Sequence, residues 1–118
     1  MPKILVVDDE PGLRLLYSAE LADEGYQVVT AENCSEAAAA LTSQQIDLVV
    51  LDIQIKKESG LEMLQQIVKD RSGIPVILCS AYNCYKDDFA SWLADAYVVK
   101  SSDLSELKSE IRRLLKPG

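Results

Sequence analysis

Short runs of hydrophobic residues recur along this chain, and segments with helical spacing separate them. Each run is five or six residues long, is rich in β-branched side chains and is closed by polar residues. Runs of this kind are typical of strands that are buried on both faces of a sheet. The predicted strands are residues 3–7, 27–31, 47–52, 75–80 and 96–100.

Each predicted strand is followed by hydrophobic residues at the spacing of a helix. Pro11 suits the first turn of the first helix, and Gly25 ends it. Asn33 and Glu36 form a capping-box-like pair ahead of an alanine-rich second helix. The hydrophobic positions predicted for the five helices are Leu13, Leu16, Tyr17 and Leu21; the alanines up to Leu41; Leu61, Leu64, Ile67 and Val68; Tyr85, Phe89, Trp92 and Leu93; and Leu104, Leu107, Ile111, Leu114 and Leu115.

Five strands that alternate with five helices predict an α/β fold with a parallel sheet and helices on both of its faces. The length of 118 residues suits one domain with a single core, which we expect to span residues 1–118. For a unit of this size we expect the flavodoxin-like strand order 2-1-3-4-5. Strands one and three then flank the switch point, where such sheets bind ligands.

Charge and composition exclude several classes of function. The net charge of −7 argues against non-specific binding of nucleic acid. The chain has no histidine, which excludes histidine-ligated zinc, Ser-His-Asp hydrolysis and a phosphohistidine donor within this chain. No hydrophobic run approaches the length of a membrane span, and Met1 leads directly into a strand, so we expect a cytoplasmic protein.

Three cysteines, Cys34, Cys79 and Cys84, show no C-x-x-C pair. An odd number without such a pair favours free thiols in or near the core over a disulfide framework or a zinc site.

The predicted strands end on residues that can do chemistry together. The first ends before Asp8 and Asp9, the third on Asp52, the fourth on Ser80 and the fifth on Lys100. Since parallel strands share one carboxyl edge, we expect these five side chains to face the same crevice. Each alone has a plainer explanation: Asp52 as a strand-terminating residue, Asp8 and Asp9 as a favourable charge for the next helix, Ser80 as a turn residue and Lys100 as a solubility residue.

Together these side chains match the needs of phosphoryl transfer. Clustered carboxylates repel one another, and a hard cation that prefers oxygen ligands, such as Mg²⁺, relieves that repulsion. A lysine and a hydroxyl group can bind the oxygens of the same anion. An aspartate is a known nucleophile toward phosphoryl groups, with which it forms an aspartyl phosphate.

The sequence resembles the receiver domain of two-component response regulators over essentially its whole length. Each matching segment is short, but their order and spacing agree with that family. The segments are residues 4–10 (ILVVDDE), 51–52 (LD) with 60–62 (GLE) downstream, 80–81 (SA) and 94–100 (ADAYVVK).

The resemblance implies that Asp52 accepts phosphate from a histidine kinase or a histidine phosphotransfer protein. It also implies that Asp8 and Asp9 hold Mg²⁺, or Mn²⁺, together with Asp52 and the backbone carbonyl of Gln54. Such a protein is a switch that assists its own phosphorylation and dephosphorylation, and not a conventional enzyme.

Further residues take roles only through this resemblance. Ser80 and Lys100 would bind the phosphoryl oxygens, and Tyr97 would be a switch aromatic that turns inward as Ser80 moves to the phosphate. The alternative for Tyr97 is simple packing against the fourth helix. Gln54 and Tyr82 would flank the attacking water and tune the lifetime of the aspartyl phosphate.

The sequence departs from the family pattern at a few positions. Ser101 stands where a proline, often with a cis bond, usually follows the lysine of strand five. A cis bond to a residue other than proline costs about 3–4 kcal/mol, so we predict a trans Lys100–Ser101 bond. Lys56 also replaces a usual proline, Leu93 replaces a usual glycine, and the segment between Ser80 and Lys100 is about two residues short of the family pattern.

Two alternatives remain beside the phosphorylated switch. One is a receiver that serves only as a protein-docking module. The other is a haloacid-dehalogenase-like phosphatase, which needs a second aspartate at position 54, where this chain has Gln54. In the switch interpretation the output surface is the fourth helix, fifth strand and fifth helix, which bind a downstream protein. The receiver either acts alone or is followed by an output domain, and we expect no contact of its own with nucleic acid or membrane.

Overall fold

A five-stranded parallel sheet forms the centre of the molecule. The computed structural model describes residues 2–55, 58–70, 73–80, 94–99 and 104–115. The strand order is β2-β1-β3-β6-β7, which confirms the predicted order 2-1-3-4-5 and the flavodoxin-like architecture. The strands are β1 (Lys3–Val7), β2 (Gln27–Ala31), β3 (Leu48–Asp52), β6 (Val76–Ser80) and β7 (Ala96–Val99).

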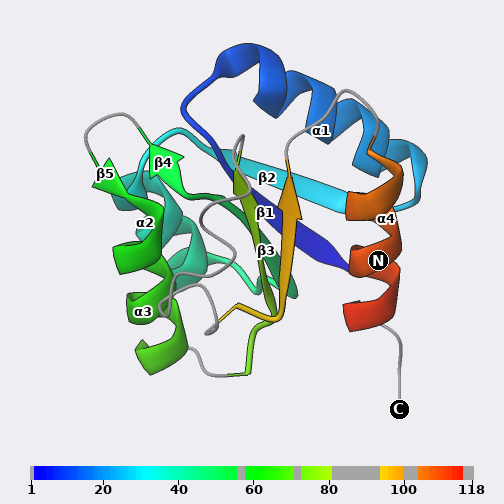
Figure 1. Ribbon diagram of the computed structural model, residues 1–118. Coiled ribbons are helices and arrows are strands. Elements are labelled where there is room, and N and C mark those ends of the chain that lie inside the picture. The colour runs from blue at the N-terminus through cyan, green and yellow to red at the C-terminus, as the bar shows by residue number, and fades with distance from the viewer. Residues whose placement is uncertain (1, 56–57, 71–72, 81–93, 100–103, 116–118) are drawn as a thin grey trace.

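Helices cover both faces of this sheet, as Figure 1 shows. Helices α1 and α4 lie on one face, and α2 and α3 lie on the other. The last of the five predicted helices corresponds to α4. The predicted fourth helix, with Tyr85, Phe89 and Trp92, falls outside the described residues. The bounds of the described helices are α1 (Pro11–Asp23), α2 (Cys34–Ser43), α3 (Gly60–Asp70) and α4 (Ser105–Leu115).

Alternating residues of the strands fill two separate cores. In β1, Ile4 and Val6 join the core under α1 and α4, while Leu5 and Val7 join the core under α2 and α3. All four side chains are at most 1% exposed. Burial on both faces is the reason that β1, β3 and β6 have continuous hydrophobic runs and not alternating patterns, whereas the edge strand β2 exposes Gln27 and Thr30.

Local sequence signals set the helix ends largely as predicted. Pro11 is the first residue of α1, and Gly25 follows the helix with a positive φ of 93°, which glycine adopts without strain. The side chain of Asn33 accepts a hydrogen bond of 2.8 Å from the amide of Glu36 and caps α2. The Glu36 carboxylate in turn accepts from the amide of Glu32, one residue earlier than in a standard capping box.

A small antiparallel hairpin, which the hydrophobic pattern does not predict, follows β3. Its strands are β4 (Gln54–Ile55) and β5 (Glu58–Ser59), paired Gln54 to Ser59 and Ile55 to Glu58. It lies between the central strand and α3 (Figure 1).

Two aspartates pair with backbone groups where strands begin. Asp47, next to β3, accepts a hydrogen bond of 2.7 Å from the amide of Lys3, and its own amide donates to the Lys3 carbonyl. Asp95, next to β7, exchanges the same two bonds with Val76, each of 2.8 Å. We call this end of the sheet, marked by Asp47 and Asp95, the amino edge.

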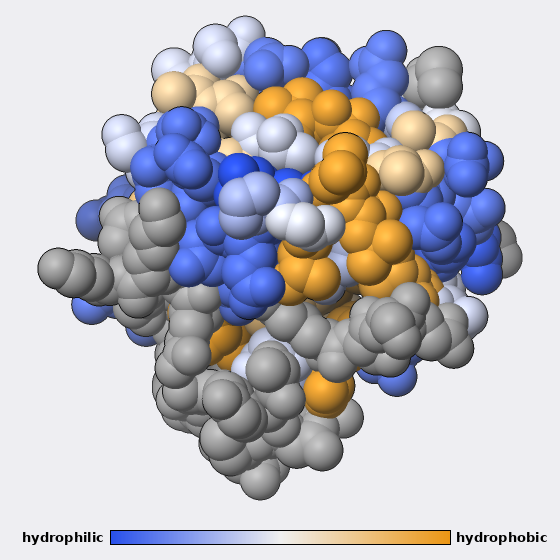
Figure 2. All heavy atoms as spheres, turned by 90° about the horizontal axis from the view of Figure 1, so that it is seen from above, coloured by the Kyte–Doolittle hydropathy of each residue, from blue (hydrophilic) through white to orange (hydrophobic). Residues whose placement is uncertain are grey.

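The surface combines charged groups with some exposed hydrophobic area. On the face shown in Figure 2, hydrophilic side chains lie at the periphery and a hydrophobic band crosses the middle. Leu15 on α1 is an exposed large hydrophobic residue, with 73% of its surface accessible. Among the described residues, no helix has both the length and the hydrophobicity to span a membrane.

Candidate metal centre at the sheet edge

The candidate site lies at the carboxyl edge of the sheet, between β1 and β3. These strands are neighbours, with Val7 paired to Leu51, so the residues that follow them emerge side by side. The chain after β1 enters α1 on one face, and the chain after β3 leads through the hairpin to α3 on the opposite face. A crevice is expected at such a switch point, since the two connections diverge there.

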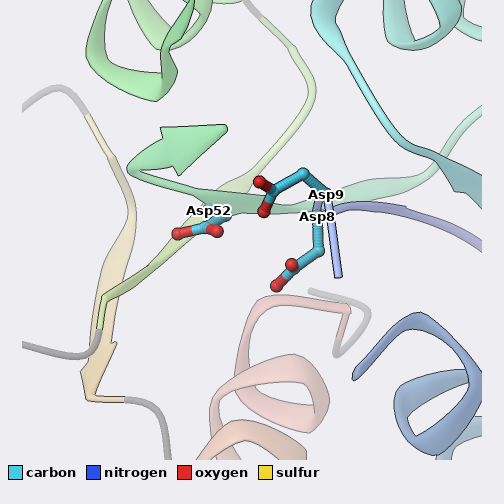
Figure 3. A group of neighbouring side chains, drawn as sticks. All are labelled: Asp8, Asp9 and Asp52. Atoms are coloured by element: carbon cyan, nitrogen blue, oxygen red, sulfur yellow. The ribbon is translucent and has the colours of Figure 1, made fainter. Parts of the chain in front are cut away.

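Three carboxylates meet at this point, as the sequence predicts. Asp8, Asp9 and Asp52 each offer a carboxylate oxygen, and these oxygens all lie within 4.8 Å of one another. Figure 3 shows the three side chains gathered beyond the strand ends. Asp8 is 1% exposed, Asp52 is 5% exposed and Asp9 is half-buried. The arrangement can therefore hold a cation with oxygen ligands that come from two different strand ends.

Electrostatics favour a cation at this cluster. Two unit charges 4.8 Å apart repel by about 3–4 kcal/mol with an effective dielectric of 20, and by about 1 kcal/mol in water. The cluster is largely buried, so its repulsion exceeds the value for water. Hard carboxylate oxygens, without nitrogen or sulfur ligands, suit Mg²⁺ or a similar divalent ion.

Backbone bonds hold Asp8 in place within the cluster. Its amide donates a hydrogen bond of 3.1 Å to the carbonyl of Ala31 on β2. Its carboxylate accepts one of 2.9 Å from the amide of Glu10, two residues ahead. The second bond is an Asx turn, which bends the chain from β1 toward α1.

The structure describes some of the other predicted site residues. Ser80 ends β6, is 3% exposed and pairs with Val99 in the sheet register. Tyr97 on β7 is half-buried and packs against the core under α2 and α3. Gln54 begins β4, two residues after Asp52 of the acidic cluster. Lys100, Tyr82 and the Lys100–Ser101 bond lie outside the described residues, so the predictions made for them stay predictions.

Fold and site together define a flavodoxin-like domain with an acidic cluster at its switch point. The sequence model of the response regulator receiver domain matches residues 4–112. The chain therefore belongs to the family of receiver domains of two-component response regulators, which are signalling proteins. This membership decides between the receiver and the haloacid-dehalogenase interpretations in favour of the receiver.

Curated relatives and solved structures agree with that family. The probable transcriptional regulatory protein TcrX of Mycobacterium tuberculosis is 38% identical over 115 residues, which are 96% of this chain and 49% of TcrX. The transcriptional regulatory protein GlrR of Escherichia coli is 38% identical over 88 residues, which are 75% of this chain and 20% of GlrR. The chain thus spans about half or less of the length of these relatives.

Among solved structures, the response regulator TrrA of Thermotoga maritima, in complex with Mg²⁺ and BeF, is 48% identical with a TM-score of 0.94. That match covers 98% of this chain and 100% of the TrrA chain. TrrA in complex with the histidine kinase ThkA matches with 47% identity and a TM-score of 0.92, over the same 98% and 100%.

Proposed function

We propose that residues 1–118 form one receiver domain that is switched by phosphorylation of Asp52. The phosphoryl group comes from a phosphohistidine on a histidine kinase or a histidine phosphotransfer protein. The observation that supports this most is the gathering of Asp8, Asp9 and Asp52 at the switch point of a receiver fold. The solved complex of the similar regulator TrrA with its kinase ThkA supports the same class of partner.

Asp52 has the position that such a transfer needs. It ends β3 at the carboxyl edge of the sheet and is 5% exposed, so we expect a donor to approach it from that edge. A carboxylate oxygen of Asp52 forms a bond to phosphorus while the bond from phosphorus to the histidine nitrogen breaks. The electron pair of that bond leaves with the imidazole. The donor histidine belongs to another protein, because this chain contains none.

The donor set fits Mg²⁺ or Mn²⁺, which would supply the positive charge that offsets the carboxylates and the phosphoryl oxygens. Asp8, Asp9 and Asp52 would hold the ion with the backbone carbonyl of Gln54.

The hairpin register supports the carbonyl ligand. In an antiparallel hairpin, opposite residue pairs alternate between pairs that are hydrogen-bonded to each other and pairs that are not. The pair that flanks a two-residue connection is hydrogen-bonded, so the next pair is not. Since Ile55 pairs there with Glu58, the carbonyl of Gln54 turns away from its partner strand.

The phosphoryl oxygens would be bound by Ser80 and Lys100. Ser80 is buried at the end of β6, and Lys100 follows Val99, the register partner of Ser80. Tyr97 would respond to phosphorylation; its side chain is half-buried, so a more buried position would change its exposure. Tyr82, with Gln54, would tune the lifetime of the aspartyl phosphate.

Two surfaces would carry the signal. The exposed Leu15, in the first half of α1, would offer an incoming kinase a hydrophobic contact. The downstream protein would bind the region of the predicted fourth helix, β7 and α4. We propose a cytoplasmic protein whose receiver contacts proteins and not membrane. Its net charge of −7 argues against a contact of the receiver itself with nucleic acid.

Intact mass spectrometry after incubation with acetyl phosphate and Mg²⁺ tests this function. We expect wild type to gain the mass of one phosphoryl group, and EDTA to prevent the gain. Asp52→Asn should gain nothing, while Asp47→Asn, which removes the same charge near the start of β3, should react as wild type does. A wild-type protein that stays unmodified but still binds a partner would instead support the docking-only receiver.

A further inference from the structure

Arg14 occupies a position on α1 that the helix itself disfavours. It is the fourth residue of the helix, and its amide donates to the carbonyl of Glu10 in the first turn. The amino end of a helix carries partial positive charge, so a cation there is unfavourable. No acidic side chain in the first turn of α1 offsets it. A favourable contact elsewhere must therefore hold this side chain.

The guanidinium of Arg14 connects the loop after β1 with the loop after β2. Its Nη1 donates a hydrogen bond of 2.7 Å to the backbone carbonyl of Asp8. Its Nη2 lies 3.9 Å from the Glu32 carboxylate, just beyond β2, and the Arg14 side chain is only 19% exposed. The rigid, planar fork of an arginine suits this task of binding two acceptors at once.

The carbonyl that Arg14 binds belongs to the peptide bond between Asp8 and Asp9. A peptide unit is planar from one Cα to the next, so a fixed carbonyl direction fixes both of these Cα atoms. Asp8 is also held at its other peptide bond, through its amide and Ala31. The Asp8 carboxylate also accepts a hydrogen bond from the Glu10 amide. Arg14 adds to these bonds the one contact described at the carbonyl between the two carboxylate-bearing residues.

We propose that Arg14 is a positioning residue for the acidic cluster and sets its affinity for divalent cations. This proposal rests on the proposed function, which needs that cation. Arg14 does not touch the ion; it holds the Asp8–Asp9 peptide in the orientation that directs the carboxylates of Asp8 and Asp9 toward Asp52.

Two effects of Arg14 on cation binding have opposite signs, so an experiment can separate them. A positive charge near the site repels Mg²⁺, and its removal alone would tighten binding. Loss of positioning would weaken binding, because the carboxylates would no longer be arranged for the ion in advance. Positioning predicts that Arg14→Gln binds Mg²⁺ more weakly.

Isothermal titration calorimetry with Mg²⁺ on the whole chain measures this directly. Loss of a group that orients metal ligands typically lowers metal affinity by about 10- to 100-fold, and we expect about 10-fold for Arg14→Gln. Arg14→Lys, which keeps one donor but not the fork, should fall between Arg14→Gln and wild type. Glu32→Gln should weaken binding less than Arg14→Gln, because the bond to the Asp8 carbonyl remains.

Arg112→Gln is the matched control. Arg112 on α4 forms an ion pair of 3.0 Å with Glu24, so the substitution removes the same charge and one ion pair on another part of the surface. It should leave the Mg²⁺ affinity at the wild-type value. Thermal unfolding in EDTA, followed by circular dichroism, shows that each variant is folded; if Arg14→Gln is not, Arg14→Lys carries the comparison.

The possible outcomes separate this proposal from the proposed function. If wild type binds Mg²⁺ and Arg14→Gln binds it equally well or more tightly, the positioning role is wrong while the proposed function stands. If wild type binds no Mg²⁺, the proposed function fails and the positioning role falls with it.

Discussion

Aspartates lie at both ends of the sheet, but their surroundings differ. At the amino edge, Asp47 and Asp95 are separated, and each accepts a hydrogen bond from the amide of a neighbouring strand. At the carboxyl edge, Asp8, Asp9 and Asp52 crowd within 4.8 Å of one another. The same side chain thus stabilises the fold at one end and creates a charged cluster at the other.

Strand direction explains this difference. Parallel strands all begin at one edge, where they present amide N–H groups, and all end at the other, where they present carbonyl groups. A carboxylate at the amino edge meets donors from the strands, and a carboxylate at the carboxyl edge meets mainly acceptors. The two edges of a parallel sheet therefore suit different tasks. The amino edge binds acidic side chains through its amides, and the carboxyl edge favours a cation between acidic side chains.

The largest effect should come from removing one charge of the cluster. In EDTA, Asp9→Asn relieves two repulsions, with Asp8 and with Asp52. Each is worth about 1 kcal/mol in water and about 3–4 kcal/mol at an effective dielectric of 20, so the free energy of unfolding should rise by about 2 kcal/mol or more. Urea unfolding measures this value. At millimolar Mg²⁺ the advantage should shrink or reverse, since the variant offers the ion one carboxylate fewer.

Asp23→Asn is the control for that substitution. Asp23 is exposed at the end of α1, so the variant loses the same charge away from the cluster. Its stability in EDTA should stay close to wild type. An Asp9→Asn protein that is less stable than wild type in EDTA would contradict the repulsion argued for the carboxyl edge.

A smaller effect of opposite sign should appear at the amino edge. Asp47→Ala leaves the amide of Lys3 without its acceptor in a part-buried hydrogen bond, and a typical hydrogen bond of this kind contributes about 0.5–1.5 kcal/mol. The loss should be the same in Mg²⁺ and in EDTA. Urea unfolding of Asp47→Ala and of Asp47→Asn, which keeps an oxygen acceptor, separates the contribution of the hydrogen bond from that of the charge. A loss of stability that depends on Mg²⁺ would contradict the difference argued between the two edges of the sheet.

The smallest effect should come from a carboxylate on the outer surface. The side chain of Glu20 accepts a hydrogen bond from Lys108, and this bond raises the pKa of Lys108 above its ordinary value of 10.5. A raised lysine pKa contributes stability below pH 10.5 and loses it as pH rises through the folded-state pKa. Glu20→Gln should therefore lower stability slightly at neutral pH, and the difference from wild type should vanish above the Lys108 pKa. Thermal unfolding from pH 7 to pH 12 measures it.

Much of this architecture follows from the sequence, because strands buried on both faces can be recognised as hydrophobic runs. Those runs predict where the strands lie, and the flavodoxin-like order expected for a unit of this size places Asp8, Asp9 and Asp52 at one edge of the sheet. The cluster was thus predictable without any knowledge of side-chain packing.

Other features depend on contacts that the pattern does not encode. The hairpin after β3 escaped prediction because Lys56 and Lys57 join its strands in place of a typical turn pair such as Asn-Gly. The sequence pattern places Asp47 within a strand but does not predict its bond to Lys3, which joins residues 44 positions apart. Arg14 was missed as well, although a cation in the first turn of a helix is a signal that a search could use.

The pairing of Asp52 with Cys79 in the sheet has one more consequence. With 2% of its surface accessible, the Cys79 thiol is shielded from reagents until the middle of the sheet opens. The rate of alkylation of Cys79 would therefore report how often the middle of the sheet opens, without any attached label. The half-buried Cys34, at the start of α2, would supply a second thiol in the same molecule for comparison.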